Sequence, residues 1–134
     1  MAGLMRAGEV SFTSYSGAWA GYDTQKNKKA TGGTIEMAIS GAESTRFANV
    51  SGVIQVPDFS RHSPTVGSSI IFREFSGRVN LRTGAITARC EKGIIRGHVD
   101  RNAHGVVGRL RVNSGPYRIA GVYFADENEI SKGD

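Results

Sequence analysis

The chain has 134 residues, of which 39% are hydrophobic and 22% are charged; these proportions are typical of one folded domain and exclude a disordered chain. Glycine is abundant at 18 residues and proline is scarce at 3, a balance that suits kinked strands and tight turns. The single cysteine, Cys90, excludes an internal disulfide and a metal site built from three or four cysteines, and the formal net charge is +5.

No stretch reaches the roughly 20 apolar residues that a membrane-spanning helix needs. The opening, MAGLMRAGEV, has no apolar core of a signal peptide, so we expect either an intracellular protein or the mature form of a secreted one. We interpret residues 1–134 as a single domain, with a short flexible N-terminus over about residues 1–8 and an acidic C-terminal tail over about 126–134.

The first half of the chain alternates apolar and polar residues, a pattern that predicts strands with one buried face. Its first three segments are YSGAWAGY, GGTIEMAIS and RFANVSGVIQV. In the second and third, the positions expected on the inner face are Ile35, Met37, Ile39, Val50, Ile54 and Val56. A fourth segment, SSIIFREFSGRVNL, runs from Ser68 to Leu81, and Gly77 is its expected bend.

The second half continues with shorter strands and tight turns. RTG leads into AITARC, RNAHG separates KGIIRGHVD from VVGRLRV, and NSGP is a strong turn signal before the last strand, YRIAGVYFA. In KGIIRGHVD one face carries Ile95, Gly97 and Val99, and the other carries Ile94, Arg96 and His98. In YRIAGVYFA one face carries Tyr117, Ile119, Gly121 and Tyr123, and the other carries Arg118, Ala120, Val122 and Phe124.

These segments are spaced too closely for parallel crossovers, which need a dozen or more residues. We therefore predict an all-β fold, a single small antiparallel up-and-down β-barrel of about eight strands, because closure removes exposed sheet edges. Glycines at strand centres suit the sharp coiling of a small barrel: Gly52, Gly97, Gly108 and Gly121. We expect Trp19 to cover one end of the barrel, with Gly17 and Gly21 leaving room for its indole.

The sequence carries no catalytic motif, since HExxH, GxSxG, the phosphate-binding P-loop and GxGxxG are all missing and the carboxylates are scattered. We therefore expect a protein that is not an enzyme. The three histidines, His62, His98 and His104, show no short metal-ligand spacing, so we expect no metal site, although His98 and His104 could approach across a hairpin. Cys90, near Arg89 and Lys92, is either a plain strand residue or a thiol of lowered pKa.

Positive charge is concentrated in one part of the chain. From Arg78 to Arg118 there are nine Lys and Arg residues, opposed only by Glu91 and Asp100. Such a segment is typical of a surface that meets an acidic protein, an anionic surface or nucleic acid, or of a solvated outer strand face. The segment from Ile94 to Val112 has no aromatic side chain on which bases could stack, which disfavours nucleic acid.

The longest expected loop is PDFSRHSPTVG, in which Phe59 either anchors a partner or folds back onto the barrel. We interpret the chain as a non-enzymatic binding protein whose basic surface steers an acidic protein partner in a salt-sensitive association. The candidate partner-binding residues are Phe59, Arg61, His62, Arg96, Arg101 and Arg109.

YSGAWAGY resembles the Tyr-x-Gly-x-Trp-x-Gly-Tyr opening of barrel domains in transferrin-binding protein B-like and factor H-binding protein-like surface lipoproteins of bacteria. ANVSGVIQV, FSGRVNL and GIIRGHVDRNAHGVVGRL with YRIAGVYFA resemble later segments of these domains, so the resemblance covers Tyr15 to Ala125. It implies an eight-stranded barrel outside a Gram-negative cell that binds a host protein or haem. The chain lacks a lipobox cysteine, and HVDRNAHG stands where the family has Phe-Tyr-Gly-Pro. No binding residue of the family is matched.

Two alternative functions remain open at this point. The first is a lipocalin-like carrier of a small ligand, with haem as the candidate cofactor and His62, His98 or His104 as its axial ligand. The second is an intracellular or phage-encoded inhibitor that uses the same barrel. The expected location is extracellular or the outer cell surface for a mature form, and otherwise cytoplasmic. The leading interpretation needs no cofactor.

Overall fold

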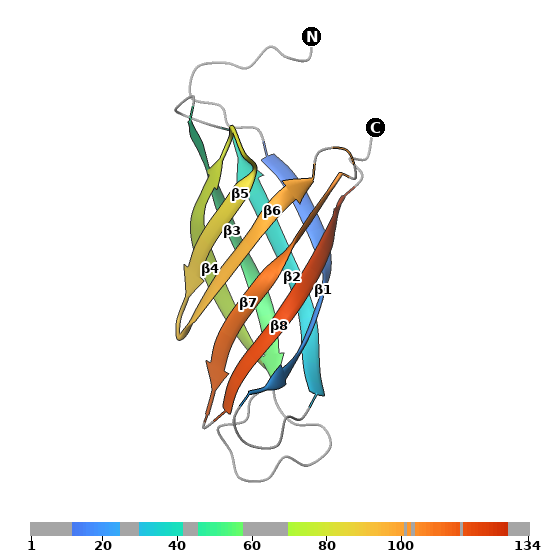
Figure 1. Ribbon diagram of the computed structural model, residues 1–134, viewed down its shortest axis with the longest axis vertical. Coiled ribbons are helices and arrows are strands. Elements are labelled where there is room, and N and C mark those ends of the chain that lie inside the picture. The colour runs from blue at the N-terminus through green and yellow to red at the C-terminus, as the bar shows by residue number, and fades with distance from the viewer. Residues whose placement is uncertain are drawn as a thin grey trace.

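The computed structural model describes residues 12–24, 30–41, 46–57, 70–100, 102, 104–115 and 117–128. Eight antiparallel strands follow one another around a closed barrel, and the last pairs back to the first (Figure 1). The strands are β1 (Phe12–Asp23), β2 (Ala30–Ser40), β3 (Phe47–Pro57), β4 (Ile70–Asn80), β5 (Ala85–Cys90), β6 (Gly93–Asp100), β7 (Gly105–Ser114) and β8 (Tyr117–Glu127). The predicted up-and-down barrel is confirmed.

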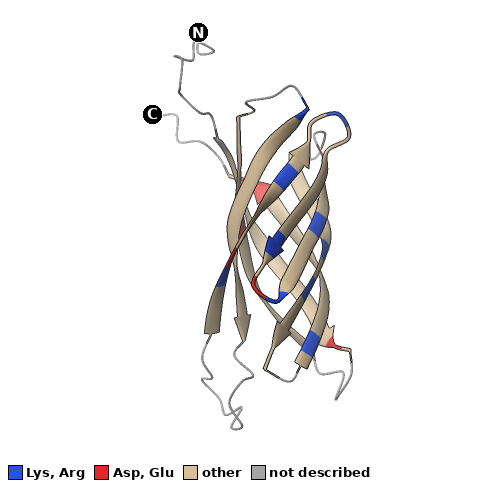
Figure 2. Ribbon diagram, turned by 90° about the vertical axis from the view of Figure 1, so that its left-hand side faces the viewer, with Lys and Arg blue, Asp and Glu red and all other residues tan. Residues whose placement is uncertain are grey.

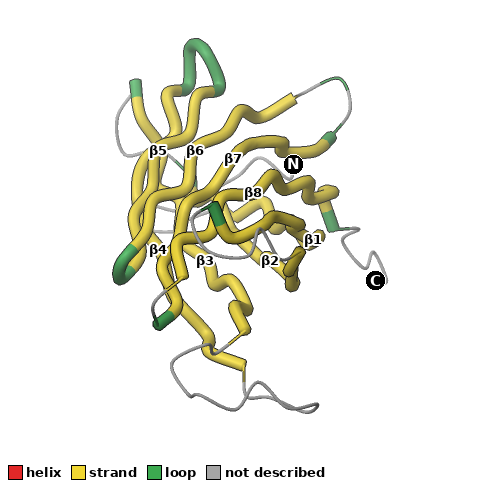
Figure 3. Tube along the Cα trace, turned by 60° about the horizontal axis from the view of Figure 1, so that its bottom comes forward, coloured by secondary structure: helices red, strands yellow, loops and turns green. Residues whose placement is uncertain are grey.

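The described chain consists of strands, turns and short irregular segments and contains no helix, as Figure 3 shows. It therefore contains no helix of the length and hydrophobicity needed to cross a membrane. The last strand runs through Asp126 and Glu127, where the sequence suggested the start of an acidic tail, and the backbone N–H of Asn128 donates to the carbonyl of Ser14 at 2.8 Å. Antiparallel pairing with β1 thus holds the chain in the barrel to this point.

The core lies inside the barrel, on the face that the alternation of each strand predicts. Buried side chains from all eight strands form one hydrophobic cluster, and Ile39 packs against it with a few partly buried residues. The largest members are the ring-bearing side chains of Tyr15, Trp19, Phe75 and Tyr123, each less than a tenth exposed. Because these side chains occupy the interior, the barrel is stabilised by burial of apolar surface, as in a small barrel filled by its own residues.

Trp19 is part of this core. The glycine that leaves room for its indole ring is not one of the two that the sequence suggested. The indole Nε1 donates to the carbonyl of Gln55 on β3 at 2.8 Å, and it reaches that strand by crossing Gly33, the cross-strand partner of Trp19 on β2. A Cβ on Gly33 would lie 2.9 Å from Nε1. A Cβ on Gly17 or Gly21 would instead collide with backbone of β8, so these glycines permit close strand approach.

Two buried polar side chains link neighbouring and opposite strands near one end of the barrel. The β5–β6 hairpin turns early, so β4 continues beyond its pairing with β5 (Figure 1). In this region Arg73 points inward and its Nη1 donates to the carbonyls of Glu91 at 3.1 Å and Asn113 at 2.6 Å, while Ser114 Oγ donates to the carbonyl of Pro57 at 2.7 Å. These bonds satisfy carbonyls near the hairpin and tie β7 to β3 across the barrel end.

Candidate partner-binding surface

Five outward-facing arginines lie on four neighbouring strands, and we call this set the arginine wall: Arg78, Arg89, Arg96, Arg109 and Arg111. The strand register arranges them in two rows. One row runs across β4 to β7 as Arg78, Thr87, Arg96 and Arg109. The next row runs as Ser76, Arg89, Ile94 and Arg111. Since neighbouring strands lie about 4.8 Å apart, the five arginine positions lie close together on one outer surface.

Period-two alternation explains why these arginines face outward. On β6 and β7 the neighbours of Arg96 and Arg109 along the chain include Ile95 and Leu110, which are buried in the core. Burial of these apolar side chains fixes the register, because a slip by one residue would turn the arginines into the barrel. Figure 2 shows that the Lys and Arg positions on the strands gather toward one side of the barrel.

The arginine wall has little internal compensation for its charge. None of Arg89, Arg96, Arg109 and Arg111 makes an ion pair with a carboxylate in the described part of the chain. Arg78 stacks over the ring of Phe47 at 5.4 Å from its centroid, a contact that leaves the charge in place. Arg96 and Arg109 are direct cross-strand partners, an arrangement that disfavours folding because like charges repel. The wall is therefore a surface whose positive charge has no ion-pair partner among the described residues.

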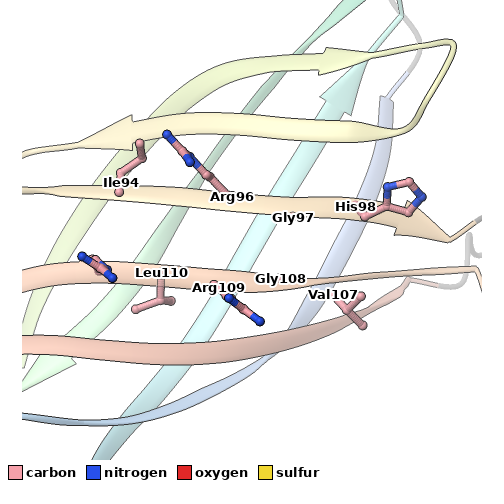
Figure 4. A pocket seen from close by; sticks show the side chains of 9 residues that line it. Ile94, Arg96, Gly97, His98, Val107, Gly108, Arg109 and Leu110 are labelled. Atoms are coloured by element: carbon pink, nitrogen blue, oxygen red, sulfur yellow. The ribbon is translucent and has the colours of Figure 1, made fainter. Parts of the chain in front are cut away.

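A shallow groove of about 630 Å³ lies over β6 and β7 within this wall. Arginines, His98 and the apolar side chains of Ile94 and Val107 surround it. Figure 4 shows that Arg96 leans toward β5 and Arg109 leans toward β8, so the two guanidinium groups spread over the surface and do not converge on one point. Such a geometry suits an extended acidic surface better than a single small anion.

Two glycines and a tyrosine form the underside of the groove. Gly97 and Gly108 are cross-strand partners, and the hydroxyl of Tyr123 lies where a Cβ on either would project. This hydroxyl is buried and has no hydrogen-bond partner among the described residues. Burial raises the pKa of the Tyr123 phenol far above its ordinary value, so the phenol stays neutral. The ring thus packs directly beneath the β6–β7 backbone that carries Arg96 and Arg109.

The structure brings together only some of the residues chosen from the sequence. Arg96 and Arg109, both candidate partner-binding residues, are direct cross-strand partners, and their role in binding stays a prediction. Phe59, Arg61, His62 and Arg101 lie outside the described residues, so their roles stay predictions. The remaining members of the arginine wall were visible only as basic residues in the sequence. Two features together identify these arginines as one set: each faces outward, and the pairing of neighbouring strands places them in common rows. In this way Arg78 falls in the same row as Arg96.

The two described histidines lie on the outside of the barrel. His98 is exposed on β6 opposite Val107, and the Nδ1 of His104 lies 3.4 Å from the Oε1 of Glu127, with His104 76% exposed. A haem bound through either would therefore rest against the outer wall. The described residues include no cluster of three or more His, Cys, Asp or Glu side chains able to hold a metal ion.

Cys90 faces inward at the end of β5 and is partly buried. Burial raises the pKa of its thiol, and the nearby positive charge of Arg73 opposes this rise only in part. The thiol form is thus favoured over the reactive thiolate, which agrees with the interpretation of Cys90 as a strand residue.

Comparison of the chain with protein-family models and with curated proteins finds no match to either.

Proposed function

We propose that the chain is a non-enzymatic binding protein whose arginine wall binds an acidic protein partner. The observation that carries the proposal is the direct pairing of Arg96 with Arg109 on a surface where Arg89 and Arg111 also have no carboxylate partner among the described residues. Like charges placed opposite each other on a sheet cost stability, and an acidic partner would remove that cost on binding.

An acidic protein fits this surface better than nucleic acid does. Single-strand binders interleave positive charge with aromatic side chains on which bases stack. Strands β5, β6 and β7 carry four of the five arginines of the wall and have no Phe, Tyr or Trp, so no such ring stands between these arginines for a base to stack on. The arginines thus recognise carboxylates of the partner, and electrostatic steering accelerates the association of the two proteins.

The resemblance to transferrin-binding protein B-like lipoproteins adds a location to this proposal. A barrel of that kind would act at the outer cell surface or in secreted form and would bind a host protein. A pull-down from host serum and from bacterial lysate in parallel tests the location. A serum protein that is retained at low salt and released at high salt supports the surface role, whereas a single bacterial protein would place the function inside the cell.

The charge dependence is tested on the captured protein by measuring its association rate at several ionic strengths. We expect the rate to fall steeply with added salt for the native chain, and to be low and nearly salt-independent for an Arg96→Glu/Arg109→Glu variant. The matched control compares single variants with the same charge change: Arg82→Glu, in the turn between β4 and β5, keeps most of the salt dependence, whereas Arg96→Glu within the wall reduces it. A native association rate that is indifferent to ionic strength contradicts the proposal.

A further inference from the structure

An exposed apolar surface lies directly beside the arginine wall, on the outer faces of β7, β8 and β1. Its members, which we call the apolar stripe, are Val107, Phe124, Ala18, Val122, Ala20, Ala120 and Tyr22. The large side chains are well exposed, at 47% for Val107, 60% for Val122, 53% for Phe124 and 49% for Tyr22. Single exposed apolar residues are normal, but a contiguous group of them marks an interaction surface.

The register joins the apolar stripe and the arginine wall into one surface. Across β7, β8 and β1, one row is Val107, Phe124 and Ala18, the next is Arg109, Val122 and Ala20, and the third is Arg111, Ala120 and Tyr22. Arg109 and Arg111 therefore form the border between the two surfaces. A partner that covers Val122 also meets the guanidinium group of Arg109.

The shape of this surface decides which partner fits it. Strands β7, β8 and β1 are each hydrogen-bonded to a neighbour on both sides, so no sheet edge is free there and a partner cannot add a strand. The partner must instead lay side chains across an outer sheet face, which is how an amphipathic helix packs on a sheet. One flank of that helix would need carboxylates to match Arg109 and Arg111.

A second copy of the chain fits less well. Two copies meeting through the apolar stripe would bring their bordering arginines, and a net charge of +5 on each chain, toward each other. This repulsion disfavours self-association through the stripe. The charge pattern favours a partner of opposite sign.

We propose that the apolar stripe and the bordering arginines together dock an amphipathic helix of the partner, with its apolar face on Val122 and Phe124 and its acidic flank toward Arg109 and Arg111. The inference rests on the proposed function, since it specifies the form of the acidic partner. The inference goes beyond the proposed function in one respect. It requires that exposed apolar side chains of β8 contribute to affinity, which binding through charge alone does not require.

The test uses the full chain and a synthetic helical peptide of roughly 18 residues, with leucines at helical spacing and glutamates along one flank. Binding is measured by fluorescence anisotropy for the native chain, for Val122→Thr/Phe124→Thr, and for the matched control Ile70→Thr/Phe72→Thr. Ile70 and Phe72 are exposed to a similar extent, at 53% and 63%, but lie on β4 away from the stripe. We expect the first variant to weaken binding by about tenfold or more, since central apolar contacts dominate interfaces, and the control to bind like the native chain.

Circular dichroism checks that both double variants keep their strands, as we expect because threonine suits exposed strand positions. A peptide of the same composition in scrambled order, which has no apolar face, should bind at least about tenfold more weakly than the helical peptide. Equal binding of the two peptides would overturn the inference.

Three outcomes separate this inference from the proposed function. If Val122→Thr/Phe124→Thr binds the helical peptide like the native chain while Arg96→Glu/Arg109→Glu loses salt-sensitive binding, the helix inference fails and the acidic-partner proposal stands. If the arginine variant binds all acidic probes normally, both fail. If vesicles of phosphatidylcholine and phosphatidylglycerol bind through Val122 and Phe124 and the helical peptide does not, the stripe meets a membrane surface and the inference is overturned.

Discussion

The inward and outward faces of β6, β7 and β8 are built in different ways. Inside, Gly97 and Gly108 lack side chains where the hydroxyl of Tyr123 lies, so one large residue is matched by two small ones. Outside, Arg96 and Arg109 face each other with the same charge, and Val122 beside them is 60% exposed. Folding explains the inner residues through packing. It does not explain the outer ones, which is why the outer face is the candidate for function.

The largest expected effect tests the inner face. Trp19→Ala should lower the free energy of unfolding by about 3–5 kcal/mol, because it removes a buried ring and leaves a cavity beside Gly33. It also leaves the carbonyl of Gln55 without its 2.8 Å bond from the indole. Equilibrium unfolding in urea measures the change.

The matched control is Tyr22→Ala, on the same strand but facing outward and 49% exposed. We expect this variant to stay within about 1 kcal/mol of the native chain, since exposed positions contribute little to stability. If Trp19→Ala and Tyr22→Ala lowered the free energy of unfolding by similar amounts, the inner and outer faces would not differ in their contribution to stability.

The distinction itself could be predicted from the sequence, because alternation along a strand assigns each side chain to one face. Alternation assigns Ile95 to the inner face and Arg96 to the outer face, and the structure confirms both assignments. Contacts between strands could not be predicted so readily. The space for Trp19 comes from Gly33 on the next strand, whereas the sequence pointed to its neighbours Gly17 and Gly21.

In the candidate site, too, the sequence predicted which side chains face outward but not which residues on neighbouring strands are paired. That Arg96 and Arg109 point outward follows from alternation, but their direct pairing depends on how the β6–β7 hairpin closes, with Asp100 opposite Gly105. The continuity of Val122 and Phe124 with these arginines depends on a further register, between β7 and β8. Register is set by turn geometry and core packing together, and a single strand does not encode it.

A smaller effect tests the inner face through pH. An exposed phenol has a pKa near 10, and burial raises the pKa of Tyr123 above that value in the folded chain. A neutral Tyr123 therefore contributes stability that is fully present below about pH 10 and is lost as pH rises through the folded pKa. Stability measured by urea unfolding should fall above pH 10.

Tyr123→Phe isolates this contribution, because burial also raises the pKa of Tyr15 and of Cys90. The variant should lose stability less steeply above pH 10, by up to about 1.4 kcal/mol per pH unit. At pH 7 it should be as stable as the native chain or more so, by about 1 kcal/mol at most, since the hydroxyl it removes has no partner among the described residues. An identical alkaline slope would show that Tyr123 ionises as an exposed residue does.

The smallest expected effect on stability gives the sharpest test of the difference between the inner and outer faces of β6 and β7. Arg96→Thr/Arg109→Thr should leave the free energy of unfolding unchanged or raise it by up to about 1 kcal/mol, because it removes a like-charge pair and places β-favouring residues on the sheet. The same variant should lose salt-sensitive binding to the acidic partner. Stability and binding would then depend on opposite faces of the same two strands. A clear loss of stability would instead mean that the arginines support the fold, and the charge on the outer wall would no longer call for a partner.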